Sequence, residues 1–216
     1  MQINKLSITS QSSIEFEVDH LTNINFFCGC FSDLTLDLIR ELIGDYGLKN
    51  DPDGIDDGRF IIHSDIIIDN KKYSVCYIRN FDTIGESRIG VNFEENSIYP
   101  SLSDTTEFID HRKQIGAIFS NNVFEYCNNN KIAAESDKVL AQFYRFIDDI
   151  QRQDDKRPIF IYDLFERIDE STAISSLIDM LKNTGRQVFI AIGEGYLANK
   201  LLREDISYIN TEYHIR

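Results

Sequence analysis

The sequence predicts an α/β fold: a mixed sheet with a parallel centre, flanking helices and a β-rich lobe. Three short apolar runs, 24–28, 159–163 and 187–192, lack alternation, as expected of strands that are buried on both faces. A helical pattern joins the last two runs, and a strand-helix-strand succession implies a right-handed crossover between parallel strands. We therefore expect the three runs to lie side by side in one sheet.

The chain begins with the pattern of an antiparallel strand pair. Apolar residues alternate with polar ones through much of 2–18, the period of half-buried strands. The buried run 24–28 then leads into a turn at 29–33. Apolar residues recur at helical spacing over 35–43, and Gly44 is expected to end this helix.

The middle of the chain has a different character. Residues 51–58 are rich in Asp and Gly and predict turns, and they are followed by strand candidates at 60–68, 73–79 and 89–93. We interpret this part as a β-rich lobe. Residues 105–126 are more helical in pattern.

The last third has the strongest patterns. An amphipathic helix is predicted from Val139 to Ile150, and a buried strand over 158–162. A second amphipathic helix covers 173–181, Gly185 closes it, and the buried strand 187–192 follows.

Composition excludes several functional classes. The 216 residues include 36 Asp and Glu against 22 Lys and Arg, and the formal charge of -14 repels phosphodiester backbones. The chain alone is therefore not expected to bind nucleic acid. Its four cysteines follow no disulfide or zinc spacing, and it shows neither a signal segment nor an apolar run long enough to span a bilayer. We expect a cytoplasmic protein with no membrane contact.

The segment from Ile159 to Asp169 carries a specific resemblance. It is similar to the Walker B strand and D-loop of ABC-type ATPases, and most similar to the SMC and RecF group of chromosome and DNA-repair ATPases. In that family the strand ends in an Asp that orients Mg²⁺ through water, and a Leu-Asp pair begins the D-loop. The resemblance assigns Asp163 to the first role, and Asp169, which follows Ile168, to the second.

Three further segments resemble the same family. Strand residues 26–28 and Gly29 are similar to the strand that enters the Walker A loop. Ser136 lies where the signature segment would be, and Gly193 stands where the family has a switch His that senses the γ-phosphate. The resemblance covers about half of the chain, at both ends, and implies a P-loop NTPase fold. It makes the chain a single ABC-ATPase-like domain, with its core in 1–48 and 131–216 and an inserted lobe in 49–130.

The resemblance also shows what the chemistry lacks. The motif GxxxxGK[ST] supplies glycines whose amides curl around phosphates, a Lys for β/γ charge and a hydroxyl for Mg²⁺. From Gly29 onward, Leu34 and Thr35 occupy the places of the second Gly and the Lys, while Asp33 and Asp37 add negative charge. One misplaced charge at contact distance costs about 1 to 4 kcal/mol. Tight binding of ATP and Mg²⁺ is therefore not expected.

Two other parts of the machinery are also missing. Leu164 replaces the acidic residue that activates water, a role worth roughly 10²- to 10⁴-fold in rate. Glu135 and Ser136 replace the Gly pair of the signature segment. We therefore predict no catalytic residue, no metal and no cofactor. The candidate site residues are Gly29, Ser32 and Thr35 in a degenerate Walker A-like loop, Asp163 in a Walker B-like strand, Asp169 in a D-loop-like segment and Ser136 in a signature-like segment.

These observations support one leading hypothesis and leave others open. The leading one is a pseudo-ATPase subunit that acts as a protein-binding scaffold in a bacterial DNA-repair or anti-phage assembly, with an active SMC-like or RecF-like ATPase, an effector or a second copy as its partner. An alternative is ATP binding, or a composite ATPase site completed on a partner by Asp169 and Ser136. Another is an α/β binding domain outside the family, in which Asp163 and Asp169 are ordinary acids at the end of a parallel strand.

Overall fold

The computed structural model describes residues 1–10, 15–29, 31–43, 59–80, 87–91, 136–152, 158–162, 171–193 and 206–211. It divides into two compact units, one made of 1–21, 37–119 and 213–216 and the other of 22–36 and 120–212. The boundary falls within helix α1 (Ser32–Leu42). The helical pattern at 105–126 and the stop at Gly44 lie outside the described residues, and the inserted lobe at 49–130 stays a prediction.

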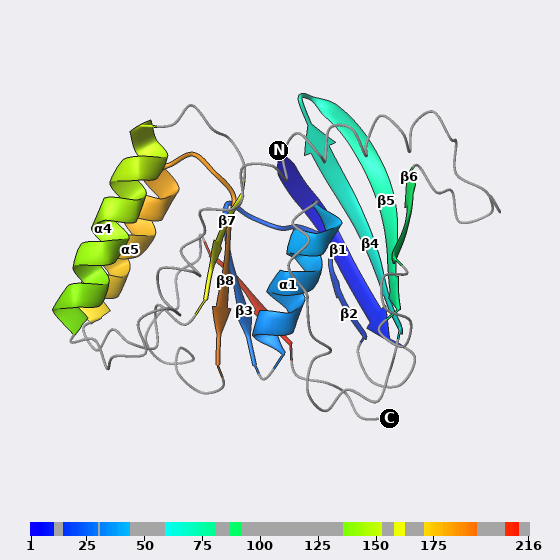
Figure 1. Cartoon of the computed structure of the whole chain (residues 1–216), viewed down its shortest axis with the longest axis horizontal. Helices are drawn as coiled ribbons and strands as arrows, with labels where there is room; N and C mark the ends of the chain where they lie inside the picture. The colour runs from blue at the N-terminus through cyan, green and yellow to red at the C-terminus, as the bar shows by residue number, and fades with distance from the viewer. Residues whose placement is uncertain are drawn as a thin grey trace. The chain divides into compact units, whose positions relative to one another are not determined.

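The first unit contains an antiparallel sheet with the strand order β2-β1-β4-β5-β6 (Figure 1). Its strands are β1 (Gln2–Ser10), β2 (Glu15–Val18), β4 (Arg59–Ile68), β5 (Lys71–Asn80) and β6 (Ser87–Val91). The predicted strand pair at 2–18 and the three predicted strands of the β-rich part are confirmed. Alternate residues of β1, β4 and β5 are buried, as the two-residue period of a half-buried strand requires; they include Leu6, Ile8, Phe60, Ile62, Ile66, Tyr73, Val75 and Tyr77.

A two-residue turn joins β4 to β5. Asp69 and Asn70 have φ values of 48° and 66°, and Ile68 pairs with Lys71 across the turn. Positive φ at both central residues matches the twist of the flanking strands, and Asn and Asp tolerate it better than other residues with a Cβ. This turn fixes the register of the ten-residue pairing between β4 and β5.

The second unit contains a parallel sheet with the order β7-β8-β3-β9 (Figure 1). Its strands are β7 (Ile159–Ile161), β8 (Val188–Ile192), β3 (Ile24–Cys28) and β9 (Ser207–Asn210). The prediction that the three apolar runs share one sheet is confirmed, with β8 between β7 and β3. The described sheet is wholly parallel rather than mixed, because the antiparallel strands pair among themselves.

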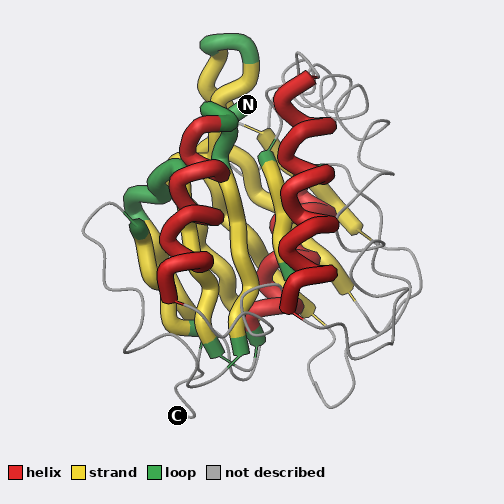
Figure 2. Tube along the Cα trace, turned by 90° about the vertical axis from the view of Figure 1, so that its left-hand side faces the viewer, coloured by secondary structure: helices red, strands yellow, loops and turns green. Residues whose placement is uncertain are grey.

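Two helices cover one face of the parallel sheet. Helices α4 (Ser136–Arg152) and α5 (Ser171–Asn183) pack against this face, as Figure 2 shows from their side. The shared core includes Ile24, Phe26, Phe143, Ile147, Ile161, Ile174, Leu177, Ile178, Leu181, Val188, Ile190 and Ile192. Each such side chain contributes about 1.5 to 3 kcal/mol through burial. No helix in the described part of the chain is long and apolar enough to cross a membrane.

The opposite face of the parallel sheet carries a row of aromatic side chains. The ring centroids of Phe160 and Phe189 lie 5.3 Å apart in a stacked pair, and those of Phe189 and Phe27 lie 6.2 Å apart. All three side chains are buried. The sheet is therefore apolar on both faces, which explains why its strands have no polar alternation in the sequence.

A buried arginine links α4 to the turn after α5. Gly185 has φ 65° and ends α5 as predicted, and the next residue, Arg186, donates a hydrogen bond of 3.0 Å to the carbonyl of Ile150. Burial lowers the pKa of the Arg186 guanidinium. The cation faces the carboxyl end of α4, where the helix dipole is negative.

The amino end of β3 is fixed by a fully buried amide. The Oδ1 atom of Asn25 accepts a bond of 2.8 Å from the Thr22 amide, and its Nδ2 donates to the carbonyls of Thr22 and Val188 at 2.8 and 3.2 Å. Asn25 has an exposed fraction of 0%. Its side chain therefore bonds to backbone groups of Thr22, just before β3, and of Val188 in the neighbouring β8.

Replacing Asn25 by Leu should lower the free energy of unfolding by about 2 to 4 kcal/mol. The substitution removes the side-chain hydrogen bonds to the amide, hydroxyl and carbonyl of Thr22 and to the carbonyl of Val188. Urea denaturation of the two proteins measures the difference. Asn23→Leu, on an exposed neighbouring Asn, is the control and should change stability by less than about 0.5 kcal/mol. Equal effects of both substitutions would contradict this role of Asn25.

Candidate functional site

The candidate site lies at the carboxyl edge of the parallel sheet. Cys28 at the end of β3 pairs with Ile192 of β8 on one side and with Asn210 of β9 on the other. Ligands of open α/β sheets bind beyond the carboxyl ends of the strands. The predicted Walker A-like turn and the predicted switch position, Gly193, therefore follow adjacent strands.

The turn after β3 is short. Only residues 29–31 separate β3 from α1, so the helix begins at Ser32, earlier than the predicted start at Thr35. The predicted turn at 29–33 was too long because Ser32 and Asp33 belong to the helix. Ser and Asp at a helix start satisfy free amides and oppose the positive end of the helix dipole.

Hydrogen bonds within the protein engage three amides of the turn and of the helix start. Gly29 donates to the carbonyl of Ile192 at 3.1 Å, and Ser32 donates to the carbonyl of Gly29 at 3.2 Å. Thr35 donates to the carbonyl of Phe31 at 3.0 Å, the first turn of the helix. A Walker A loop instead presents such amides to phosphate oxygens. A phosphate could reach these three amides only by displacing bonds that hold the turn and the helix start.

Gly29 has a conformational role in this arrangement. Its φ is 124°, a value that residues with a Cβ rarely adopt. The positive φ turns the chain out of β3 while the Gly29 amide still extends the ladder to β8. The presence of glycine at this position is therefore explained by the turn itself.

The other two predicted Walker A-like residues are buried. Ser32 and Thr35 each have an exposed fraction of 4%. The sequence resemblance assigned Thr35 the place of a phosphate-binding Lys, and the side chain at this position lies inside the protein. Between them, Asp33 is exposed, so the charge on this turn of the helix is negative.

Thr211 is a residue of this edge that the sequence did not reveal. Its amide and its hydroxyl both donate to the carbonyl of Cys28, at 2.8 and 2.9 Å. Thr211 is buried and follows β9, a four-residue strand that the sequence analysis did not predict. These two bonds join the carboxyl ends of β9 and β3.

The remaining predicted residues are placed in part. Ser136 is the first residue of α4, and its signature-like role stays a prediction. Asp163, Leu164 and Asp169 lie outside the described residues. The strand before Asp163 is β7, whose three residues are buried and pair with β8.

The site has no reactive thiol among its described groups. Burial raises the pKa of the Cys28 thiol to about 11, so the group is protonated at neutral pH. Cys30 lies outside the described residues. Within the described ranges, no cluster of His, Cys, Asp and Glu could hold a metal ion.

Comparison with known proteins reveals the fold. No family model and no curated protein sequence matches the chain. Among solved structures, the SMC head domain from Thermotoga maritima matches with a TM-score of 0.51 at 11% identity, over 90% of both chains. The recombination mediator protein RecF of the RecFOR pathway matches with a TM-score of 0.36 at 12% identity, over 84% of this chain and 53% of that one. The chain thus has an SMC head-like α/β fold.

Replacing Gly29 by Ala should destabilise the protein by about 1 to 3 kcal/mol, because a Cβ disfavours the backbone conformation at φ 124°. Thermal and urea denaturation without nucleotide measure the effect. Gly193→Ala is the matched control at the end of the adjacent strand, since Gly193 does not have a positive φ. A Gly29→Ala protein as stable as the wild type would contradict the conformational role.

Proposed function

We propose that this chain is a catalytically inactive ABC-type subunit, a pseudo-ATPase that acts as a protein-binding scaffold. The observation that carries the proposal is the turn of residues 29–31 between β3 and α1. It stands where the fold's phosphate-binding loop would lie, and internal hydrogen bonds use the amides of Gly29, Ser32 and Thr35. The fold is retained without the cradle that ATP would need.

The side-chain chemistry at three separate positions supports the same function. Thr35 replaces the phosphate-binding Lys and is buried, so neither charge nor access is available there. Leu164 carries no group that could deprotonate water, and Gly193 no imidazole that could contact a γ-phosphate. Neighbouring groups could compensate for one loss. General-base assistance and neutralisation of the phosphate charge act on different atoms of the reaction, so no single group could compensate for both losses.

The proposed partner is a protein with a basic face. A formal charge of -14 steers basic surfaces toward the chain. Salt screens this attraction at separations beyond the Debye length, which is about 8 Å at physiological ionic strength. An active SMC-like or RecF-like ATPase in a bacterial DNA-repair or anti-phage assembly is the partner we favour, ahead of an effector or a second copy. The resemblance directs us to residues 29–33, Ser136 and Asp169 as contact positions. If both residues complete a nucleotide site on that partner, the chain is a composite-site subunit.

ATP should not bind the isolated protein with measurable affinity. Restoring the family's lysine by Thr35→Lys should not restore binding. We expect Thr35→Lys to lower the unfolding free energy by about 2 kcal/mol or more, because it places an ammonium group in a site that is only 4% exposed. Asn183→Lys, on an exposed residue at the end of α5, is the control and should change stability by less than about 1 kcal/mol.

Calorimetric titration with ATP-Mg²⁺, a phosphate-release assay and urea denaturation together check these outcomes. Micromolar ATP binding by the wild type, or turnover that Asp163→Ala abolishes, would overturn the pseudo-ATPase assignment.

Reversing one charge in the D-loop-like segment should disrupt the complex with the partner. Chemical crosslinking in the native host, followed by mass spectrometry, identifies proteins bound to the wild type. Asp169→Arg should reduce recovery of a basic-faced ATPase by about tenfold or more, as loss of a steering charge and an interface contact would. Asp149→Arg, an equal charge change on the exposed side of α4, is the control. Equal recovery with both variants would rule out this contact surface.

A further inference from the structure

A β-bulge interrupts the pairing of β1 with β4. Ile3 pairs with Ile66 and Lys5 pairs with Asp65, so Asn4 is an extra residue without a partner on β4. The carbonyl of Asn4 instead accepts a bond of 2.9 Å from the Leu21 amide. Bulges bend a strand and redirect its side chains, and they are enriched beside functional sites.

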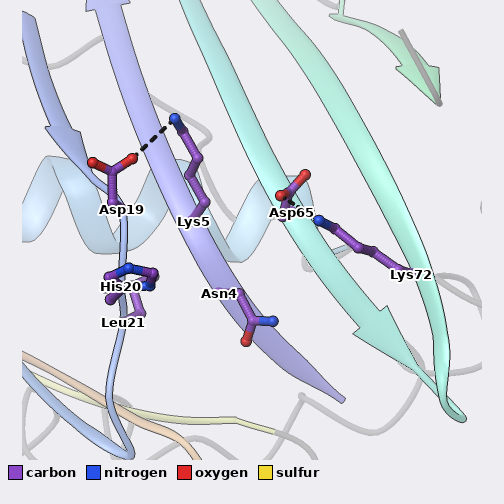
Figure 3. Close-up of a pocket in the computed structure, with 7 residues that line it drawn as sticks. All are labelled: Asn4, Lys5, Asp19, His20, Leu21, Asp65 and Lys72. Atoms are coloured by element: carbon purple, nitrogen blue, oxygen red, sulfur yellow. Dashed lines mark ion pairs between the residues drawn. The ribbon is translucent and has the colours of Figure 1, made fainter. Parts of the chain in front are cut away.

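A hollow with a volume of about 620 Å³ lies beside this bulge (Figure 3). Its size is within the range of small-molecule sites, which is roughly 300 to 1,000 Å³. All of its lining residues belong to the first unit. They are Asn4, Lys5, Asp19, His20, Leu21, Asp65 and Lys72.

Two ion pairs flank the hollow. The Nζ atom of Lys5 lies 3.0 Å from Asp19 and also pairs with Glu17, while Lys72 lies 2.9 Å from Asp65. Figure 3 shows the Lys5 and Asp19 pair on one side and the Lys72 and Asp65 pair on the other. The lining therefore presents two ammonium and two carboxylate groups.

Local hydrogen bonds favour the charged forms of Asp65 and Lys5. Burial alone would raise the pKa of Asp65, but hydrogen bonds from Lys72 and from the Ser74 hydroxyl, at 2.7 Å, outweigh it and hold the pKa below its usual value. Hydrogen bonds to Glu17 and Asp19 raise the pKa of Lys5. Both signs of charge thus persist over the physiological range.

The hollow also contains unused polar groups. Within the described part of the chain, neither the imidazole of His20 nor the side-chain amide of Asn4 has a hydrogen-bond or ion-pair partner. Leu21 adds an apolar side chain to the lining. A bound molecule could therefore use neutral donors and acceptors and one apolar contact besides the charges.

We propose that this hollow binds a small zwitterion that carries an ammonium and a carboxylate group, as free amino acids do. A simple anion would be attracted by Lys5 and Lys72 but repelled by Asp19 and Asp65. A simple cation would be attracted by the two carboxylates but repelled by the two ammonium groups. A zwitterion pairs with both kinds of group. The existing pairs are partly exposed, with Lys72 60% and Asp19 69% exposed, so solvent screens the attraction within each pair. Their rearrangement around a ligand is therefore inexpensive.

Calorimetric titration of the full chain with glycine and L-leucine tests the proposal, with acetate and methylammonium as single-charge probes. We expect saturable binding of the zwitterions and affinities about tenfold or more weaker for the single-charge probes. Acetate or methylammonium binding as tightly as the zwitterions would mean an adventitious ion only and would overturn the proposal. Absence of saturable zwitterion binding would overturn it as well.

A pair of double variants locates the site. Asp65→Asn with Lys72→Met removes one ion pair without changing the net charge, and should weaken zwitterion binding about tenfold. Asp148→Asn with Arg152→Met removes an exposed pair of the same 2.9 Å length on α4 and should leave binding unchanged. If binding is unaffected by the first double variant, or equally weakened by both, the hollow is not the site.

A single variant serves if the first double variant unfolds. Asn4→Asp adds a carboxylate to the lining, so it should weaken acetate binding while strengthening methylammonium binding. Loss of fold would weaken both alike, so opposite shifts can come only from a charge placed beside the ligand. Unchanged affinities would overturn the proposal. The proposal does not depend on the proposed pseudo-ATPase function, and neither result decides the other.

Discussion

The position of β3 between two parallel partners is the constraint on which the second unit depends. All five of its residues pair with β8, and four of them also pair with β9. Asn25 secures the amino end of the strand through backbone groups of Thr22 and Val188, and Thr211 secures the carboxyl end through the Cys28 carbonyl. A strand held at both ends and on both sides fixes where the following turn and helix begin. The geometry of the candidate site is therefore a consequence of how β3 is anchored.

This anchoring separates the fold from the chemistry that the fold often supports. A strand, a glycine turn and a helix suffice to build the edge of the sheet, and here hydrogen bonds inside the protein engage the amides of Gly29, Ser32 and Thr35. A phosphate-binding loop needs the same elements with amides left open to a ligand. Since function depends on groups placed on a fold rather than on the fold itself, an SMC head-like architecture is compatible with a role in binding alone.

The sequence predicted those features of the molecule that leave a pattern of apolar residues. The uninterrupted runs of β3, β7 and β8 indicated burial on both faces, and α4 and α5 were recognised by their apolar stripes. Strand β9 was missed because it has only four residues and two of its four side chains are half-buried. Buried polar residues such as Asn25, Arg186 and Thr211 leave no periodic signal, since their role depends on backbone groups far away in the sequence. The bulge at Asn4 was hidden for the same reason.

The distance in sequence between paired strands has a consequence during translation. Asn25 bonds to Val188, 163 residues later, and Cys28 to Thr211, 183 residues later. At roughly 5 to 20 residues per second, the ribosome needs on the order of ten seconds or more to deliver the partners of β3. The partners of β1 and β4, by contrast, are all synthesised within the first 91 residues. The antiparallel sheet can therefore form on the ribosome before β8 and β9 have been synthesised. During that interval the apolar residues of β3 have no paired strands, and such exposed apolar segments are substrates for chaperones.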